Sequence, residues 1–414
     1  MKPKVAVVVS HPIQHFCPFY RALTQDGRIR LKVFFGATVG AKPYMDRQFN
    51  TMIVWQRDLL DGFEHVFLPG SDEVMEIQRP IRNRHLARFL SEFSPDVVQV
   101  YGGYHGLSRS ASFWAKARRR RVLYVSDSEL VHSRTLVKRA GHFLVLPALF
   151  AAIDGFLTVA DRNEQYYRHY RVAADRLFRC PFPVDEGRLL VADASRSEIR
   201  RALRVRLGIP SSAVCGLIVG KLTAGKCVDH AVRALQRLRT RGKEDNFWLL
   251  IAGDGPEREK LAAACAGAGL EDRVRILGFV RVEELPSVYA SADILIHPSS
   301  HDRHPLCTGE ALFVGLPIVA SDRVGSVGTS DDIRPGRNGL VYPWGEIDRL
   351  CEAWGRLSED EALRRSMGDH SRQIAAERTM RHSVDGFVRA VSAVLGSSRA
   401  AATLVAPSQA GTGA

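Results

Sequence analysis

Two carboxylates in the second half of the chain have a spacing that suits ligand binding. Asp302 and Glu310 are separated by seven residues, and Pro305 between them disfavours helix at the residue before it. A bend there would let both side chains flank one ligand, and ionised carboxylates favour ligands with many hydroxyl groups. The alternative is structural: Asp302 caps a helix, and Glu310 is a solvated acid in its first turn.

Two lysines earlier in the same half have the spacing of an anion-binding pair. Lys221 and Lys226 lie five residues apart in a short loop that begins with Gly220. Each ammonium group is a compact charge on a flexible stem, so both can reach a diphosphate. The loop is not a P-loop, because no Ser or Thr follows Lys226. Alternatively, both lysines are simply solvated.

Buried strands should precede these loops. Residues 214–219 and 293–297 are short apolar runs, typical of parallel strands that are covered on both faces. Further strands are expected at 247–252, 274–280, 318–321 and 338–342. In an open parallel sheet, the loops after the strands meet at one edge, where helix N-termini favour anions. The carboxylates and the lysines should therefore converge.

The first half repeats the alternation of strands and helices, with strands expected at 5–9, 31–35, 95–100, 121–125 and 154–159. Polar residues follow three of these strands, at the edge where ligands bind. They are His11, Gln14 and His15 after the first strand, His105 after the third, and Asp127 and Glu129 after the fourth. Alternatively, His11 and His15 are polar residues at a helix start, and Asp127 caps the helix that follows it.

The length of 414 residues suits two domains rather than one core. A Pro-rich stretch at 180–185, followed by a polar helix near 195–206, predicts the boundary. We expect an N-terminal domain at 1–190 and a C-terminal domain at 191–365. The tail at 396–414 is rich in Ala, Ser, Thr and Gly and should be disordered.

The composition is ordinary for a globular enzyme, with 45% hydrophobic and 25% charged residues. No run approaches the ~18 apolar residues of a membrane span, and the N-terminus has a short strand in place of a signal peptide, so we expect a cytoplasmic protein. The seven cysteines form no C-x-x-C pair and no zinc-type spacing. This pattern predicts neither a disulfide framework nor a structural metal.

The net charge of +13 predicts an anionic partner: nucleic acid, an acidic membrane or a phosphorylated substrate. The basic block 116–121 has no interleaved aromatic residues that would stack on bases, so we expect no nucleic acid. Segment 136–153 combines Lys138 and Arg139 with an apolar face. That face consists of Phe143, Leu144, Leu146, Leu149 and Phe150. Such a helix either lies peripherally on the inner face of an anionic membrane or packs in the core of its domain.

Residues 297–321 resemble the carboxylate signature of retaining glycosyltransferases of family 4, which have the GT-B fold. In that signature, seven positions separate an acidic residue from Glu-Ala, and a small-residue turn and Gly-x-Pro-Val/Ile-Val follow. These places are held here by Asp302, Glu310, Ala311, Gly315, Pro317, Ile318 and Val319. Asp302 stands where Glu is commoner, so the first carboxylate is one methylene shorter.

A second likeness lies near the N-terminus. Residues 11–14, His-Pro-Ile-Gln, resemble one branch of the family, in which this turn faces the acceptor. Residues 54–55 and 59–63 resemble an insertion near the acceptor cleft in the same branch. The sequence departs from the family at 126–128, Ser-Asp-Ser, where many members have a histidine. His105, Asp127 and Glu129 then become the candidates for polar groups near the acceptor hydroxyl.

The resemblance implies both a fold and a reaction. The fold would be α/β, with two Rossmann-like, doubly wound parallel-sheet domains facing across a cleft and C-terminal helices at 366–395 packing back on the first domain. The reaction would be retaining transfer of a hexosyl group from a nucleotide diphosphate sugar to a glycan, lipid-linked or small-molecule acceptor. Biosynthesis of a cell-surface glycan, polysaccharide or glycolipid would be its setting. We expect no cofactor, and no metal, because the sequence has no Asp-x-Asp motif.

The resemblance also assigns roles. Lys221 and Lys226 would neutralise the departing diphosphate, Glu310 would hold the ribose hydroxyls, and Asp302 would hold the sugar. The donor would further contact Gly220, Gly253, Gly255, Phe279, Val280, Pro305, Leu306, Cys307 and Thr308. The acceptor side would comprise His11, Gln14, His15, His105, Asp127 and Glu129. Two other interpretations remain open: a sugar-nucleotide epimerase or hydrolase on the same fold, and a binding module without catalysis.

Overall fold

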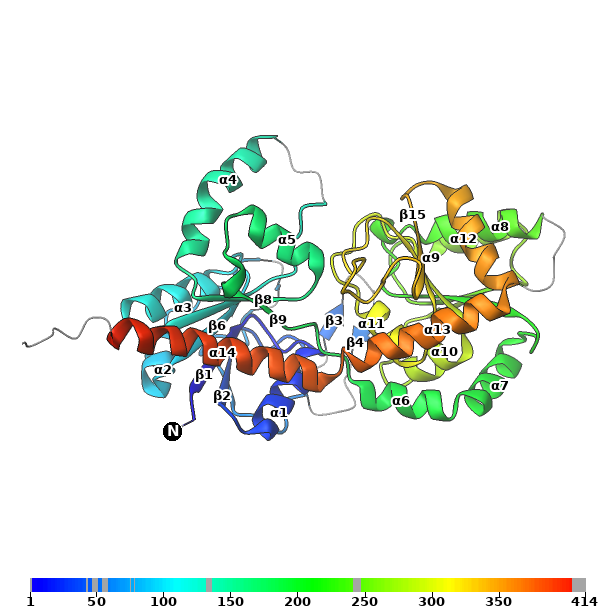
Figure 1. The fold of residues 1–414 in the computed structure, drawn as a ribbon. Coiled ribbons are helices and arrows are strands. Elements are labelled where there is room, and N and C mark those ends of the chain that lie inside the picture. The colour runs from blue at the N-terminus through cyan, green and yellow to red at the C-terminus, as the bar shows by residue number, and fades with distance from the viewer. Residues whose placement is uncertain are drawn as a thin grey trace, which may run out of the picture.

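The computed structural model describes residues 2–41, 44–46, 51–53, 59–74, 76–77, 79–131, 136–240 and 247–403. They form two α/β domains that lie side by side, with helix α6 (Glu186–Ala194) between them in the chain (Figure 1). The boundary predicted at 190 falls inside this helix. Within the described ranges, none of the helices combines the length and the apolar content that crossing a bilayer requires.

Seven described strands form the parallel sheet of the N-terminal domain, in the order β5-β2-β1-β6-β7-β8-β9. They are β1 (Lys4–Val9), β2 (Arg30–Phe35), β5 (His65–Phe67), β6 (Val97–Tyr101), β7 (Arg121–Val125), β8 (Gly155–Thr158) and β9 (Leu177–Arg179). Around them lie α1 (Phe16–Asp26), α2 (Leu86–Phe93), α3 (Gly106–Ala117), α4 (Leu136–Ala151), α5 (Asp161–His169) and the short ribbon β3 (Tyr44–Asp46) and β4 (Thr51–Ile53). Residues 5–9 are all buried, because helices cover both faces of β1.

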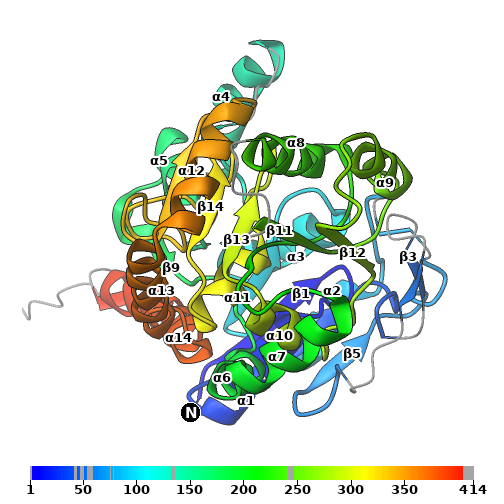
Figure 2. The same cartoon turned by 90° about the vertical axis from the view of Figure 1, so that its right-hand side faces the viewer.

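The second sheet is also parallel, and its six described strands run in the order β12-β11-β10-β13-β14-β15. They are β10 (Val214–Val219), β11 (Phe247–Ala252), β12 (Val274–Gly278), β13 (Ile294–His297), β14 (Ile318–Ser321) and β15 (Gly339–Tyr342). Helices α8 (Val228–Arg239), α9 (Arg258–Gly267) and α12 (Ile347–Glu359) cover one face, and α7 (Arg196–Leu207), α10 (Leu285–Ser291) and α11 (Leu306–Phe313) cover the other (Figure 2). The predicted pair of doubly wound domains is confirmed.

The C-terminal helix α14 (Met380–Thr403) returns to the first domain, as predicted (Figure 1). It packs on α1, β8 and β9, and its Phe387 and Val391 share a core with β1. Helix α13 (Glu361–Ala376) stays on the second domain against α11, so the crossing begins later than 366. The tail predicted from 396 is helical as far as Thr403, because alanines 400–402 favour helix. Residues 404–414 lie outside the described part.

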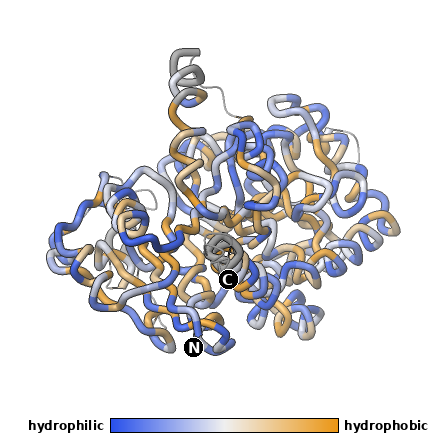
Figure 3. Tube along the Cα trace, turned by 60° about the vertical axis from the view of Figure 1, so that its left-hand side comes forward, coloured by the Kyte–Doolittle hydropathy of each residue, from blue (hydrophilic) through white to orange (hydrophobic). Residues whose placement is uncertain are grey.

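Helix α4 contradicts the core-packing interpretation in part. Phe150 is buried and Leu146 packs against the core, but Phe143 is 47% exposed and Leu149 56% exposed. The helix rises away from the sheet, as Figures 1 and 3 show. Contact with a membrane stays a prediction. The side chains of Lys138, Arg139 and Leu144 lie outside the described part, as do residues 54–55.

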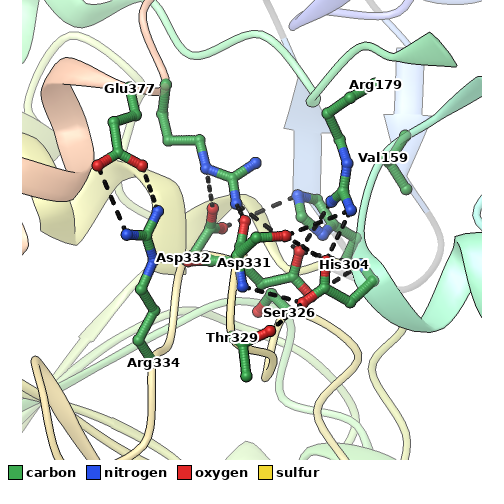
Figure 4. Close-up of polar contacts among 12 residues, drawn as sticks. Val159, Arg179, His304, Ser326, Thr329, Asp331, Asp332, Arg334 and Glu377 are labelled. Atoms are coloured by element: carbon green, nitrogen blue, oxygen red, sulfur yellow. Dashed lines mark hydrogen bonds and ion pairs between the residues drawn. The ribbon is translucent and has the colours of Figure 1, made fainter.

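A buried polar network around Asp331 joins the two domains (Figure 4). Arg179, the last residue of β9, donates to Asp331 Oδ1 over 3.0 Å and to Asp161 Oδ1 over 2.6 Å. The backbone amide of Asp161 also donates to the Asp331 carboxylate over 3.0 Å. From the other side, Arg378 lies 3.7 Å from the carboxylates of both Asp331 and Asp332. The network therefore ties β9 and α5 to the loop that precedes β15.

Candidate active site

A cavity of about 320 Å³ lies between the two domains, beside the loops that follow β1, β10 and β13. The N-terminal domain contributes Gln14, His15 and Arg21 to its wall. Helix α6, which links the domains, contributes Arg188, and the residue just before this helix, Asp185, lines the wall as well. The C-terminal domain contributes Gly220, Lys226, Val282, Glu283, Leu285, Pro305, Leu306, Cys307 and Glu310. The loops converge because β10 and β13 are neighbours in the sheet, with Gly216 paired to Ile294.

Asp302 lies beside Lys226 and holds it. Its carboxylate accepts hydrogen bonds from Lys226 Nζ and from His297 Nε2, the latter over 2.7 Å. Burial would raise the pKa of Asp302, but the contacts with His297 and Lys226 outweigh it and keep that pKa well below its usual value. Asp302 is therefore ionised. His297 was not among the predicted site residues. Its one feature in the sequence that could have indicated a role is that it is a polar residue at the end of an apolar strand.

The loop at 220–226, which carries the two lysines, packs closely against the turn at 253–255, and glycines in that turn permit the close approach. A Cβ at Gly253 would lie 1.9 Å from the Gly220 carbonyl oxygen. A Cβ at Gly255, where φ is +151°, would lie 2.6 Å from the Leu222 carbonyl oxygen. Gly253 and Gly255 thus support the loop from behind. Of the predicted lysine pair, Lys226 lines the cavity, whereas Lys221 is not among the described lining residues.

Glu310 enters the cavity from α11, and Tyr289 OH donates a hydrogen bond to its Oε2 over 2.7 Å. Burial raises the pKa of Glu310, while the Tyr289 hydrogen bond and the charge of Arg188 oppose that rise. Arg188 is fixed in turn, because it donates to Asp185 Oδ2 over 3.0 Å and to the Val282 carbonyl oxygen over 2.6 Å. Neither Tyr289 nor Arg188 was among the predicted site residues.

The first turn of α11 borders the cavity, but Thr308 is not among the described lining residues. Pro305, Leu306 and Cys307 line the wall, but the Thr308 hydroxyl lies 2.7 Å from the Pro305 carbonyl oxygen and 2.9 Å from Asp332 Oδ2, and its one proton can be donated to either acceptor. Thr308 is fully buried, so its side chain points into the domain. In the segment that follows β12, the residues that line the cavity are Val282, Glu283 and Leu285. The predicted donor contacts Phe279 and Val280 are not among the described lining residues.

On the acceptor side, the structure brings Gln14 and His15 to the cavity wall. Burial, followed by the neighbouring His304 and His11, lowers the pKa of His15 to about 4. Burial and His105 likewise lower the pKa of His11 to about 4, so both imidazoles are neutral at pH 7. His15 Nε2 is buried and has no hydrogen-bond partner among the described residues. His105 accepts a hydrogen bond from the Ile81 amide over 3.1 Å.

Asp127 and Glu129 lie where the domains touch, and neither is among the described residues of the cavity wall. Arg303 of the second domain donates to Asp127 Oδ1 over 3.3 Å. The Glu129 carboxylate lies against the second domain too, since a Cβ at Gly325 would come within 2.5 Å of Glu129 Oε2. The capping alternative for Asp127 is wrong, because residues 128–131 are not helical.

Glu129→Gln should remove a pH-dependent loss of stability. Burial raises the pKa of Glu129 to about 8, despite the opposing charges of Arg162 and Arg303. An unfolded chain releases that proton near pH ~4.3. Between these pH values the folded state keeps a proton that the unfolded state has lost, so wild-type stability falls as pH rises, and the fall stops above about pH 8.

Glutamine cannot ionise, so the melting-temperature advantage of Glu129→Gln over the wild type should grow as pH rises through this window. Thermal unfolding of both proteins between about pH 5 and 9 measures it. Glu259→Gln, at an exposed position on α9, is the matched control. A difference that stays constant with pH would contradict the prediction.

Among the described side chains, no group of three or more His, Cys, Asp or Glu is placed to hold a metal ion. Metal independence stays a prediction.

Residues 200–374 match the family model of glycosyl transferases group 1. Over 223 residues the chain is 29% identical to an alpha-D-kanosaminyltransferase of Streptomyces kanamyceticus, covering 54% of this chain and 55% of the relative. Over 211 residues it is 32% identical to a 2-deoxystreptamine glucosyltransferase of the same organism, covering 50% of this chain and 52% of the relative. The chain thus spans about half the length of these curated relatives.

Solved structures resemble nearly the whole chain. The HepE protein of Anabaena, in complex with UDP, superposes with a TM-score of 0.70 at 17% identity, covering 95% of this chain and 100% of that one. Sucrose-phosphate synthase from Thermosynechococcus elongatus gives a TM-score of 0.68 at 17% identity, covering 96% and 100%. At this identity the likeness concerns the fold. The chain therefore has the GT-B fold of glycosyltransferases, and its second domain matches the group 1 model.

Proposed function

We propose that this protein is a retaining glycosyltransferase of family 4, which moves a sugar from a nucleotide diphosphate sugar to an acceptor hydroxyl. One observation carries the proposal: Lys226, from the loop after β10, and Glu310, from α11, lie 84 residues apart in sequence and line one cavity together with the first turn of α11. A cation and a helix N-terminus suit a diphosphate, and a carboxylate beside them suits hydroxyl groups of a nucleotide sugar. The group 1 match and the names of the relatives support the same class.

In the proposed reaction, the bond between the anomeric carbon and the diphosphate oxygen breaks, and a bond to the acceptor oxygen forms on the same face. Lys226 and the first amides of α11 stabilise the charge that builds on the departing diphosphate. The acceptor proton passes to that departing oxygen. Glu310 holds the ribose. The donor must also draw Asp302 toward its sugar, because that carboxylate now binds His297 and Lys226.

The co-substrate in this proposal is a nucleoside diphosphate sugar; structures of the HepE neighbour contain UDP and UDP-glucose. The acceptor is a glycan, a lipid-linked sugar or a small molecule that enters beside Gln14 and His15. A hydrolase or epimerase on the same fold would leave labelled sugar free or still on the nucleotide. Labelled donor therefore separates these activities, because a transferase places the label on the acceptor.

Glu310→Ala should abolish most of the nucleotide-dependent stabilisation. A panel of UDP-, GDP- and ADP-sugars should raise the melting temperature of the wild type for one base, since a ligand that binds the folded state stabilises it. Losing a hydrogen-bonded carboxylate costs about 1.5–3 kcal/mol, which is roughly a 10- to 100-fold loss of affinity. Glu259→Ala, outside the cavity, should bind like the wild type. Equal stabilisation of Glu310→Ala and the wild type would count against the proposed function.

A further inference from the structure

Tyr289 links two parts of the cavity wall. It lies in α10, its side chain is fully buried in the core of the second domain, and its hydroxyl donates to Glu310 Oε2 over 2.7 Å. Leu285, which begins α10, lines the cavity four residues earlier. Because residues four apart lie on the same side of a helix, this short helix presents both Leu285 and the Tyr289 hydroxyl toward the region of the site.

The segment before α10 is held as well. Arg188 donates to the Val282 carbonyl oxygen over 2.6 Å, and its Nε is paired with Asp185. The wall from Val282 to Leu285 and the carboxylate of Glu310 are thus fixed relative to each other through α10. Both parts line the same cavity, so a nucleoside bound there would meet the wall from Val282 to Leu285 with its base and Glu310 with its ribose.

The hydrogen bond leaves most of the accepting capacity of Glu310 to a ligand. Tyr289 is the one hydrogen-bond partner that the structure gives the Glu310 carboxylate among the described residues, and it donates to Oε2. Oε1 and the second lone pair of Oε2 then remain to accept from hydroxyl groups. Without the tyrosine hydroxyl, the carboxylate would be free to turn toward the positive charges of Arg188 and Lys226, which line the same cavity.

We propose that Tyr289 is a positioning residue that makes the site select ribonucleotides over deoxyribonucleotides, by fixing Glu310 in the orientation that receives the ribose hydroxyls. This inference rests on the proposed function. It concerns selectivity, however, so it can fail while nucleotide binding itself is found.

Tyr289→Phe tests the inference, because it removes one oxygen and keeps the ring. The probes are whichever of UDP, GDP and ADP binds the wild type most tightly and the 2′,3′-dideoxy form of the same nucleotide, with affinities measured by calorimetry below the melting temperature of each variant. The wild type should prefer the ribonucleotide by roughly 10- to 100-fold. In Tyr289→Phe the ribonucleotide affinity should fall about 5- to 20-fold, while the dideoxynucleotide affinity stays unchanged.

Two comparisons separate positioning from a structural role. Tyr342→Phe is the matched control, since Tyr342 is buried in the same domain and its hydroxyl has no hydrogen-bond partner among the described residues. It should keep the wild-type preference. In a Glu310→Ala background, Tyr289→Phe should have no further effect on the affinity ratio, because the group that it positions is gone.

Each outcome decides the matter. An equal fall in affinity for both nucleotides would make Tyr289 a structural residue and overturn the inference. A wild type that binds both forms equally would overturn it as well, together with the ribose-binding role of Glu310, while leaving donor binding and sugar transfer standing. A wild type that binds no nucleoside diphosphate would remove the proposed function together with the inference.

Discussion

Lys226→Met should slow donor turnover on the order of 10²- to 10³-fold, the usual cost of removing one group that stabilises developing negative charge. Lys226 is the member of the lysine pair that lines the cavity. Methionine keeps the apolar stem and removes the charge. Release of nucleoside diphosphate, from the nucleotide sugar that stabilises the wild type, measures the rate.

Lys260→Met is the control, because the Lys260 side chain is 78% exposed on α9 and pairs with Glu257. It should turn over donor at the wild-type rate. A cation that acts mainly in the transition state affects rate more than ground-state binding, so donor affinity of Lys226→Met should fall less than its rate. An equal fall in both would confine Lys226 to donor binding, and an unchanged rate would remove it from the proposed mechanism.

The convergence of Lys226 and Glu310 was predictable because it depends on the sheet alone. Residues 214–219 and 293–297 are apolar runs of strand length, and such runs become neighbouring parallel strands when helices cover both faces. Loops after the carboxyl ends of neighbouring strands then meet. The return of α14 to the first domain followed from the family resemblance.

Other features of the site depend on contacts that no local pattern reveals. The Tyr289 hydroxyl meets Glu310 across 21 residues, and in the sequence Tyr289 looks like any apolar helix residue. Arg188 comes from α6, and its contact with the Val282 carbonyl oxygen spans 94 residues of sequence. The direction in which the Thr308 side chain points depends on its contact with Asp332. Phe143 is exposed because this side of α4 does not pack on the core of the domain. Apolar residues that recur at helical spacing identify one face of a helix, but they do not show which surface packs on that face.

Arg179→Met should destabilise the protein by about 3–5 kcal/mol at neutral pH, since it removes one partner from a buried ion pair. The Asp331 side chain is 0% exposed, and Arg179 is the guanidinium that reaches it from the first domain, over 3.0 Å. Thermal unfolding measures the effect. Arg168→Met is the control, because Arg168 is 59% exposed on α5 and lies 3.7 Å from Glu164. Its stability should stay within about 0.5 kcal/mol of the wild type.

The pH dependence of the Arg179→Met deficit shows whether Asp331 causes it. Burial and the neighbouring Asp161 raise the pKa of Asp331 to about 6, while Arg179 and Arg378 oppose the rise. Because an unfolded aspartate ionises near pH ~3.9, wild-type stability falls as pH rises from there to about 6. Removing Arg179 raises the folded pKa further, so in the variant the fall continues to higher pH.

The deficit of Arg179→Met should therefore be smallest near pH ~5, where folded Asp331 is protonated, and should widen toward pH ~8. Asp331→Asn in the same background removes the ionisable group, so that double variant should lose the widening. A deficit of equal size at every pH would place the energy elsewhere, in the contacts of Arg179 with Asp161 and Glu164. In that case the Asp331 carboxylate, which joins the domains, would contribute little, and Arg179 would stabilise mainly the first domain itself, through Asp161 and Glu164.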